Sequence, residues 1–156
     1  SCRRGEVPIV GLDGRFVDFL VLNYPCIDYI LYSKKRLLGE KFLLRPLGTP
    51  TISRGMIIVE PAPPESILDY SQYEHGEYLL KNLIDRAVVT LNGVRLGRVM
   101  DFVIGVQSKT LSILAVKVDL DAEVSNKVGE RVILLPSNRT SPEAGHMLVL
   151  ANFIQV

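Results

Sequence analysis

The chain has 156 residues, of which 47% are hydrophobic and 22% charged, and its formal net charge is +1. This composition is typical of a folded globular protein and excludes extended disorder, and the balanced charge gives no general attraction to nucleic acid or to anionic membranes. Because no apolar run approaches the roughly 18 to 20 residues of a membrane-spanning helix, we predict a cytoplasmic protein without membrane insertion.

The first 60 residues contain short apolar runs with the composition and two-residue period of strands. The dipeptide Asp13-Gly14 follows the first run and indicates a tight turn, because both residues tolerate positive φ. A segment rich in Gly, Pro and Thr before residue 56 is expected to be a loop. The spacing of the runs predicts a small β-barrel or sandwich with strands at residues 7–10, 16–22, 27–32, 41–44 and 56–59.

A proline-rich segment separates this region from the rest of the chain. Pro61, Pro63 and Pro64 remove backbone donors and fix φ, so they end the first unit. We therefore predict a first domain at residues 4–60, a linker at 61–77 and a second domain at 78–156. One short helical turn is expected at residues 77–84, where apolar side chains share a face.

The second region repeats features of the first. Residues 39–46 read Gly-Glu-Lys-Phe-Leu-Leu-Arg-Pro, and residues 129–136 read Gly-Glu-Arg-Val-Ile-Leu-Leu-Pro, so four of eight positions are identical. After the same eight-residue gap, each block is followed by a glycine and an apolar run. We interpret this pattern as an internal repeat of one β-unit.

The repeat extends toward the start of each unit. Asp13-Gly14 corresponds to Asn92-Gly93, which is another favoured hairpin pair, and Asp18 corresponds to Asp101. An aspartate beside a strand commonly accepts backbone N–H bonds at a turn, so we assign this pair a structural role rather than acid–base catalysis. Extra residues in the second copy are expected to form a loop at 119–127.

The segment 83–103 resembles the opening of a PRC-barrel domain. The family pattern is an apolar strand, a hairpin turn with a glycine, and then Gly-x-Val-x-Asp, here Gly97-Arg98-Val99-Met100-Asp101. The first copy keeps Asp13-Gly14 and Asp18, but we find no equivalent of Gly97 in it. The resemblance implies an all-β fold of two tandem small β-barrels of PRC-barrel type, the first degenerate, joined by a Pro-rich linker with at most a short helix.

The resemblance implies a binding role. PRC-barrels occur in the reaction-centre H subunit, in a ribosome maturation factor and beside transporter-like domains, where they mainly serve binding and assembly, without shared catalytic residues. We therefore expect no catalytic residues, no cofactor and no enzyme activity. The leading hypothesis is a protein-interaction or regulatory module that acts as an assembly or adaptor domain. It would have a protein partner, and a homodimer is one arrangement left open.

Three alternating carboxylates give an alternative function. Asp119, Asp121 and Glu123 would project to one side of an extended segment, where their oxygens suit a hard divalent cation. They lack the glycine and the full spacing of an EF-hand loop, so a solvated acidic loop is the favoured interpretation. The alternative is a divalent-cation-sensing module linked to a transporter.

Basic residues give the other alternative. Lys34, Lys35 and Arg36 form a basic turn, and Arg95 and Arg98 lie in the second copy, with aromatic residues between basic ones in the first. Such a surface suits an RNA- or ribosome-associated factor, because aromatic rings stack on bases and cations meet phosphates. The balanced net charge favours a charged hairpin tip instead, so nucleic acid is the less favoured partner.

The two cysteines, Cys2 and Cys26, form no metal-binding motif. They are far apart in the sequence, and there is no Cys-x-x-Cys pair. We expect free thiols and no structural zinc site.

Overall fold

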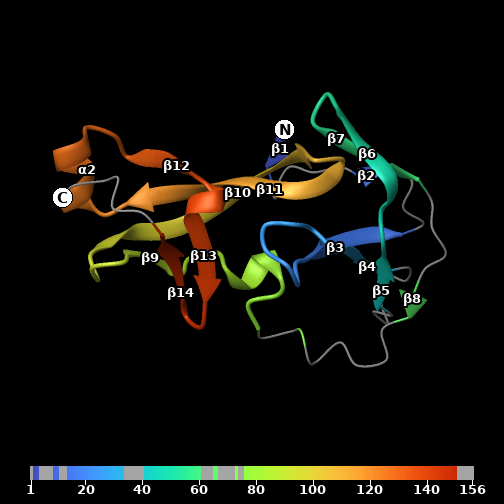
Figure 1. Cartoon of the computed structure of the whole chain (residues 1–156), viewed down its shortest axis with the longest axis horizontal. Coiled ribbons are helices and arrows are strands. Elements are labelled where there is room, and N and C mark those ends of the chain that lie inside the picture. Colours follow the sequence, from blue (N-terminus) through green and yellow to red (C-terminus); the bar gives the residue numbers. More distant parts are fainter. Residues whose placement is uncertain are drawn as a thin grey trace.

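The computed structural model describes residues 2–3, 9–10, 14–33, 41–60, 65–66, 73 and 76–150 of the chain. Most of these residues lie in strands, so the all-β prediction is confirmed. The strands form three sheets, and within the described residues none of the sheets closes into a barrel (Figure 1). No helix in the described part of the chain has the length and apolar character needed to cross a membrane.

The first half, residues 9–66, contributes two of the sheets. One is three-stranded with the order β2-β7-β6, and the other is four-stranded with the order β3-β4-β5-β8. The predicted strands at residues 16–22, 41–44 and 56–59 correspond to β3, β5 and β7. The strands are β2 (Ile9–Val10), β3 (Arg15–Leu20), β4 (Tyr29–Ser33), β5 (Lys41–Leu44), β6 (Leu47–Ser53), β7 (Met56–Glu60) and β8 (Glu65–Ser66).

The second half, residues 76–150, forms the large sheet with the order β12-β11-β10-β9-β14-β13. Strand β1 (Cys2–Arg3) joins this sheet by pairing with β10. The long β10–β11 hairpin runs along the molecule between its two ends (Figure 1). The elements are η2 (Leu80–Asn82), β9 (Ala87–Thr90), β10 (Arg95–Gln107), β11 (Thr110–Leu120), α2 (Ala122–Val128), β12 (Val132–Pro136), η3 (Ser137–Arg139), β13 (Thr140–Glu143) and β14 (His146–Val149). The 3-10 turn η2 confirms the short helical turn predicted at residues 77–84.

The order of strand pairing is nearly the same in the two halves. In the first half, β3, β4 and β5 pair antiparallel in succession, β6 and β7 form a hairpin, and β7 pairs parallel with β2. In the second half, β10, β11 and β12 pair antiparallel in succession, β13 and β14 form a hairpin, and β14 pairs parallel with β9. The second half has in addition a pairing of β9 with β10.

Two glycines let neighbouring strands approach closely. A Cβ atom at Gly97 would overlap the carbonyl oxygen of Asp119 and lie 2.8 Å from the Cα atom of Leu120. A Cβ atom at Gly14 would lie 2.5 Å from the carbonyl oxygen of Ser33. Gly14 precedes Asp18 by the same four positions that separate Gly97 from Asp101. The first half therefore has a glycine with the same spacing from its aspartate as Gly97, and this glycine also lies close to backbone atoms of a neighbouring strand.

The two aspartates also have the same local geometry. Each lies at a register shift in its strand pair, between Phe16 and Asp18 and between Val99 and Asp101. Each accepts a hydrogen bond of 2.8 Å from the backbone N–H of the following residue. These contacts support the structural role assigned to the pair, because a bulge leaves a backbone donor that a side-chain acceptor can satisfy.

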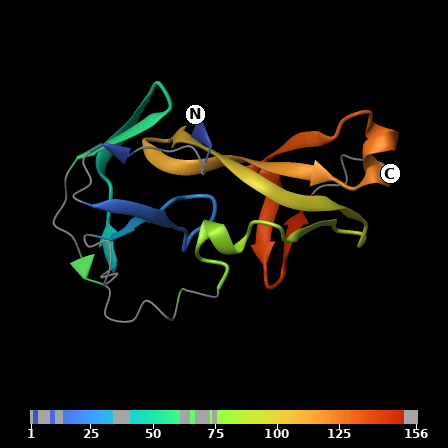
Figure 2. The same ribbon diagram turned by 180° about the vertical axis from the view of Figure 1, so that it is seen from behind.

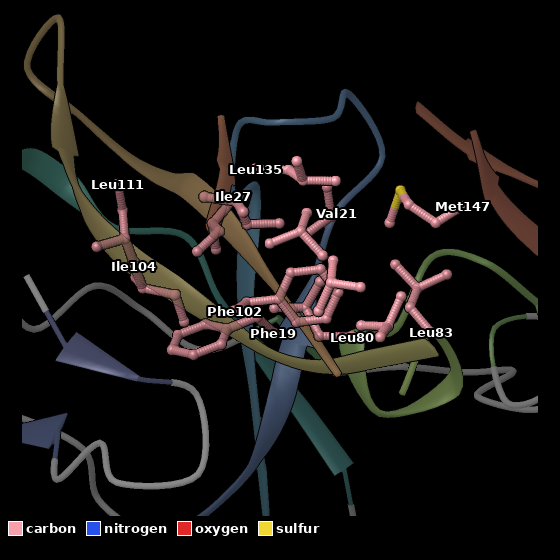
Figure 3. Packing of buried hydrophobic residues seen from close by; sticks show 14 of the residues in the cluster. Phe19, Val21, Ile27, Leu80, Leu83, Phe102, Ile104, Leu111, Leu135 and Met147 are labelled. Carbon is pink, nitrogen blue, oxygen red and sulfur yellow. The ribbon is translucent and has the colours of Figure 1, made fainter. Parts of the chain in front are cut away.

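Both halves contribute to one hydrophobic core. The largest cluster of buried side chains includes Phe19, Val21 and Ile27 from the first half and Phe102 and Ile104 from the second (Figure 3). Burial of each such side chain contributes about 1.5 to 3 kcal/mol to folding. The predicted boundaries at residues 60, 77 and 78 stay a prediction, and the prolines at residues 61–64 lie outside the described residues.

Two segments differ from the sequence prediction. The expected loop before residue 56 contains β6, which lies at a sheet edge and has a register shift between Leu47 and Thr51. An edge strand with a bulge tolerates Pro50, so the Gly, Pro and Thr content that predicted a loop is compatible with a strand here. The expected loop at residues 119–127 contains the end of β11 and helix α2, which Gly129 ends with φ +85° while its N–H donates to the Ser125 carbonyl.

Candidate interaction surface

Strand β12 forms an edge of the seven-stranded sheet and exposes apolar side chains. Its register places Leu134 opposite Lys117, which in turn lies opposite Asp101. Since residues two apart on a strand share a face, Val132, Leu134 and Pro136 form a short apolar row. The Leu134 residue is 58% exposed. We call this row, with the outer edge of β12, the β12 surface.

The corresponding edge in the first half is occupied. Strand β5 holds the position in the β3-β4-β5 series that β12 holds in the β10-β11-β12 series, and β8 pairs antiparallel with it through Phe42 and Leu43. Within the described residues, β12 pairs only with β11. An open edge presents unpaired backbone N–H and C=O groups, so the β12 surface can accept a further strand.

The three acidic candidates lie on different elements. Asp119 is in β11, Asp121 immediately precedes α2, and Glu123 is in the first turn of α2. They are therefore not aligned along one extended segment. Within the part of the chain that the structure describes, no group of three His, Cys, Asp or Glu side chains is arranged to hold a metal ion.

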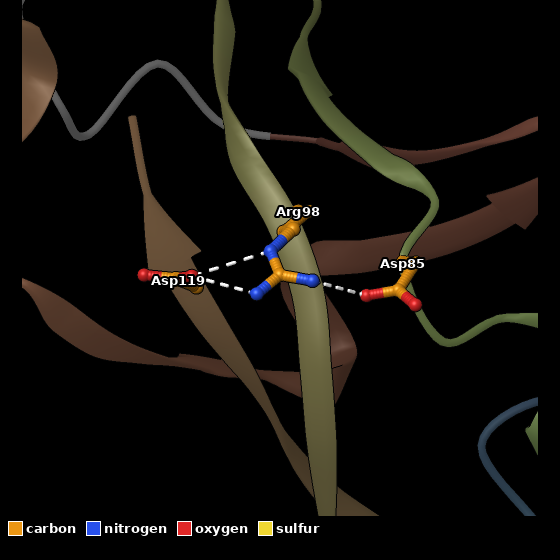
Figure 4. A network of polar contacts seen from close by, with 3 residues as sticks. All are labelled: Asp85, Arg98 and Asp119. Atoms are coloured by element: carbon orange, nitrogen blue, oxygen red, sulfur yellow. Dashed lines mark hydrogen bonds and ion pairs between the residues drawn. The ribbon is translucent and has the colours of Figure 1, made fainter. Parts of the chain in front are cut away.

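Two of these acids pair with the two basic candidates of the second half. Arg98 lies between Asp85 and Asp119, with its Nη1 2.5 Å from Asp85 Oδ1 and its Nη2 3.2 Å from Asp119 Oδ2 (Figure 4). The hydrogen bond with Asp119 and the charge of Asp85 raise the pKa of the Arg98 guanidinium above its ordinary value. Arg95 Nε lies 3.0 Å from Asp121 Oδ2. Asp85 could not be predicted as a partner, because it lies in a turn, with φ +68°, that only the fold brings beside Arg98.

The basic turn of Lys34, Lys35 and Arg36 lies outside the described residues. In the described part of the first half, the Arg45 guanidinium stacks on the ring of Tyr29, 4.5 Å from its centroid. Cation–π stacking occupies the ring face that a nucleic-acid base would use. All the site residues predicted from the sequence stay predictions.

The aspartates of the repeat are not arranged as a catalytic pair. Asp18 is fully buried and accepts a second hydrogen bond of 2.8 Å from the backbone N–H of Lys81. Asp101 lies in the other half of the molecule. In each case the described contacts go to backbone amides, which is the chemistry of a structural acceptor.

A partly buried tyrosine, Tyr24, links the halves. The Tyr24 hydroxyl donates to Thr140 Oγ1 over 2.8 Å, because Thr140 uses its own hydrogen to donate to the Ser137 carbonyl over 2.9 Å. Burial raises the pKa of Tyr24 to about 12, against the opposing effect of this hydrogen bond. The neighbouring open pocket, about 480 Å³ in volume, is lined only by uncharged residues, among them Cys26 and Ser112. This lining offers no charged group for acid–base chemistry.

Comparison with known proteins identifies the second half. The PRC-barrel domain model matches residues 75–152, which is half of the chain. No curated protein matches the sequence. The match covers the Gly97–Asp101 motif, the Arg98 ion pairs and the β12 surface.

Proposed function

The chain belongs to the PRC-barrel family, and on this basis we propose that it is a non-catalytic protein-interaction module that acts as an assembly or adaptor domain. The β12 surface carries this proposal. It combines an open sheet edge with an exposed apolar row, and this combination suits a partner that adds an extended segment as a further strand.

The proposal includes a tandem architecture. The first half, residues 9–66, is a second, degenerate unit of PRC-barrel type. Its order of strand pairing, the Gly14 contact and the Asp18 bulge support this assignment. In the first half a strand from the same chain, β8, covers the equivalent edge. This internal example supports antiparallel strand addition at β12 by a partner protein.

The charges of the second half favour a protein partner over RNA. The cationic groups of Arg95 and Arg98 are each paired with carboxylates, so they add little uncompensated positive charge. The same ion pairs occupy Asp119 and Asp121, which a divalent cation would otherwise use. Neither the RNA-associated nor the cation-sensing alternative gains support from these contacts, and the cytoplasmic location stays a prediction.

The proposal is tested by capture of partners from native lysate with matched variants. Leu134→Asp places a charge in the β12 surface, and Leu91→Asp does the same in the β9–β10 turn, where Leu91 is 57% exposed. We expect at least one lysate protein to be captured by the wild type and by Leu91→Asp but not by Leu134→Asp. If Leu134→Asp retains every protein captured by wild type, the β12 surface is not the docking site.

A further inference from the structure

The two halves meet at a short antiparallel bridge between Cys26 and Ser112. On one side of it, the Ile27 N–H donates to the Leu111 carbonyl over 2.9 Å, and on the other side the Ile113 N–H donates to the Pro25 carbonyl over 2.8 Å. Hydrogen bonds in these positions define a non-hydrogen-bonded antiparallel pair, in which the Cα atoms of the central residues are about 4.5 Å apart.

The residues in this bridge occupy equivalent positions in the two halves. Phe19 lies opposite Ile30, and Phe102 lies opposite Val116, so Ile30 and Val116 correspond. The same number of residues separates Ile30 from Ile27 and Val116 from Ile113. Cys26 therefore corresponds to Ser112.

The bridge is self-complementary as a result. Pro25 corresponds to Leu111, and Ile27 corresponds to Ile113. The Ile27 N–H donates to the Leu111 carbonyl, and in the same way the Ile113 N–H donates to the Pro25 carbonyl, so the two halves exchange equivalent hydrogen bonds. Contacts in which residue i meets j and j meets i are the signature of an isologous interface around a two-fold axis. A two-fold axis relating the two halves would pass between Cys26 and Ser112.

A second pair of contacts is also exchanged between the halves. Leu79, which precedes the first strand of the second half, bridges to Leu20 in β3. Arg3, which precedes the first strand of the first half, pairs with Val103 in β10. Leu20 and Val103 correspond, because each lies two positions after its aspartate, Asp18 or Asp101. Both views place β1 beside β10 (Figure 1 and Figure 2).

We propose that the surface around Cys26 and Ser112 is a docking surface for another PRC-type unit, and that this chain supplies that unit itself, as a two-fold pair closed within one polypeptide. The inference rests on the proposed assignment of both halves as PRC-type units. Beyond the proposed function, the inference identifies the partner of this surface as a second PRC-type unit. Because residues 25–27 and 111–113 pair with each other within the chain, a second chain does not pair with these backbone groups.

A disulfide across the axis tests the inference in the full chain. Two Cα atoms about 4.5 Å apart lie within the range that a disulfide spans, about 4.4 to 6.8 Å. In a Cys2→Ser background, the Ser112→Cys variant has two cysteines in all, Cys26 and the introduced one. Ser125→Cys in α2, far from the bridge, is the matched control.

We expect mild oxidation of the Ser112→Cys variant to remove both free thiols and to leave a cross-linked monomer by light scattering, whereas the Ser125→Cys control keeps its thiols. A disulfide-linked dimer, or two free thiols, overturns the proposal. Hydrogen exchange of the Cys2→Ser protein with Ser112 intact gives a second test. The amides of Ile27 and Ile113 are expected to exchange only on global unfolding, and fast exchange at either amide overturns it. Neither readout involves β12, so failure here is distinguishable from failure of the proposed function.

Discussion

Substitution of the two strand glycines by alanine tests whether they have the same role in both halves. The Cβ atom of Gly97→Ala meets backbone atoms of Asp119 and Leu120, which no side-chain rotation can move away. At Gly14→Ala the Cβ atom meets the Ser33 carbonyl, and the backbone has φ +151° in addition. Both β-pairs must therefore shift or separate to accommodate a methyl group.

The expected loss of stability is large for both variants. Overpacking costs about 1 to 3 kcal/mol and more where the obstacle is backbone, so we expect at least about 3 kcal/mol for Gly97→Ala. Gly93→Ala is the control, because Gly93 has φ +83° and no atom near the position of a Cβ. An L-residue with positive φ costs about 1 to 2 kcal/mol without any clash.

Urea unfolding followed by circular dichroism measures these free energies. We expect Gly14→Ala and Gly97→Ala to lose similar amounts and each to lose more than Gly93→Ala. If Gly97→Ala is no less stable than Gly93→Ala, close strand approach does not explain the glycine of the motif. If only Gly97→Ala is affected, the role of Gly14 has been misassigned.

Three further predictions use the polar contacts. Asp18→Ala removes the acceptor of the buried Phe19 N–H, at about 1 to 3 kcal/mol, and also that of the partly buried Lys81 N–H. It should therefore lose more stability in urea unfolding than Asp101→Ala, which removes one such contact, and equal losses would contradict this. Because burial raises the pKa of Tyr24 from 10.0 to about 12, the unfolded chain loses this proton first, so stability present below pH 10 declines toward pH 12. Unfolding across this interval should show a smaller decline in Tyr24→Phe, and an equal decline would refute the assignment. Calorimetry with magnesium at about millimolar concentration should show no binding heat, since Asp119 and Asp121 pair with arginines; heat that Asp119→Ala removes would show a cation site.

The all-β class and several strands could be predicted from the sequence, because alternation and turn residues are local signals. The role of Asp18 and Asp101 followed from their recurrence beside a strand. The similarity of Gly14 to Gly97 is hidden when Asp13-Gly14 is aligned with the hairpin turn at Gly93. The spacing of Gly-Arg-x-x-Asp, which occurs at Gly14 and at Gly97, was the signal that could have identified it.

Features that depend on long-range contacts could not be predicted. The pairing of Arg98 with Asp85 and Asp119 requires a turn and a neighbouring strand to converge. The bridge between Cys26 and Ser112 joins segments from opposite halves. Helix α2, by contrast, carried a local signal in Gly129, which favours the left-handed conformation that ends a helix.

Hydrogen exchange of Phe19→Ala tests most directly whether the halves share one core. Phe19 is fully buried in the first half, and its truncation should cost about 3 to 5 kcal/mol. If the core is shared, amides of β11 in the second half lose protection to the same extent as those of β4. Retention of wild-type protection in β11, with loss confined to β4, would show that the halves are stabilised independently and would contradict the account.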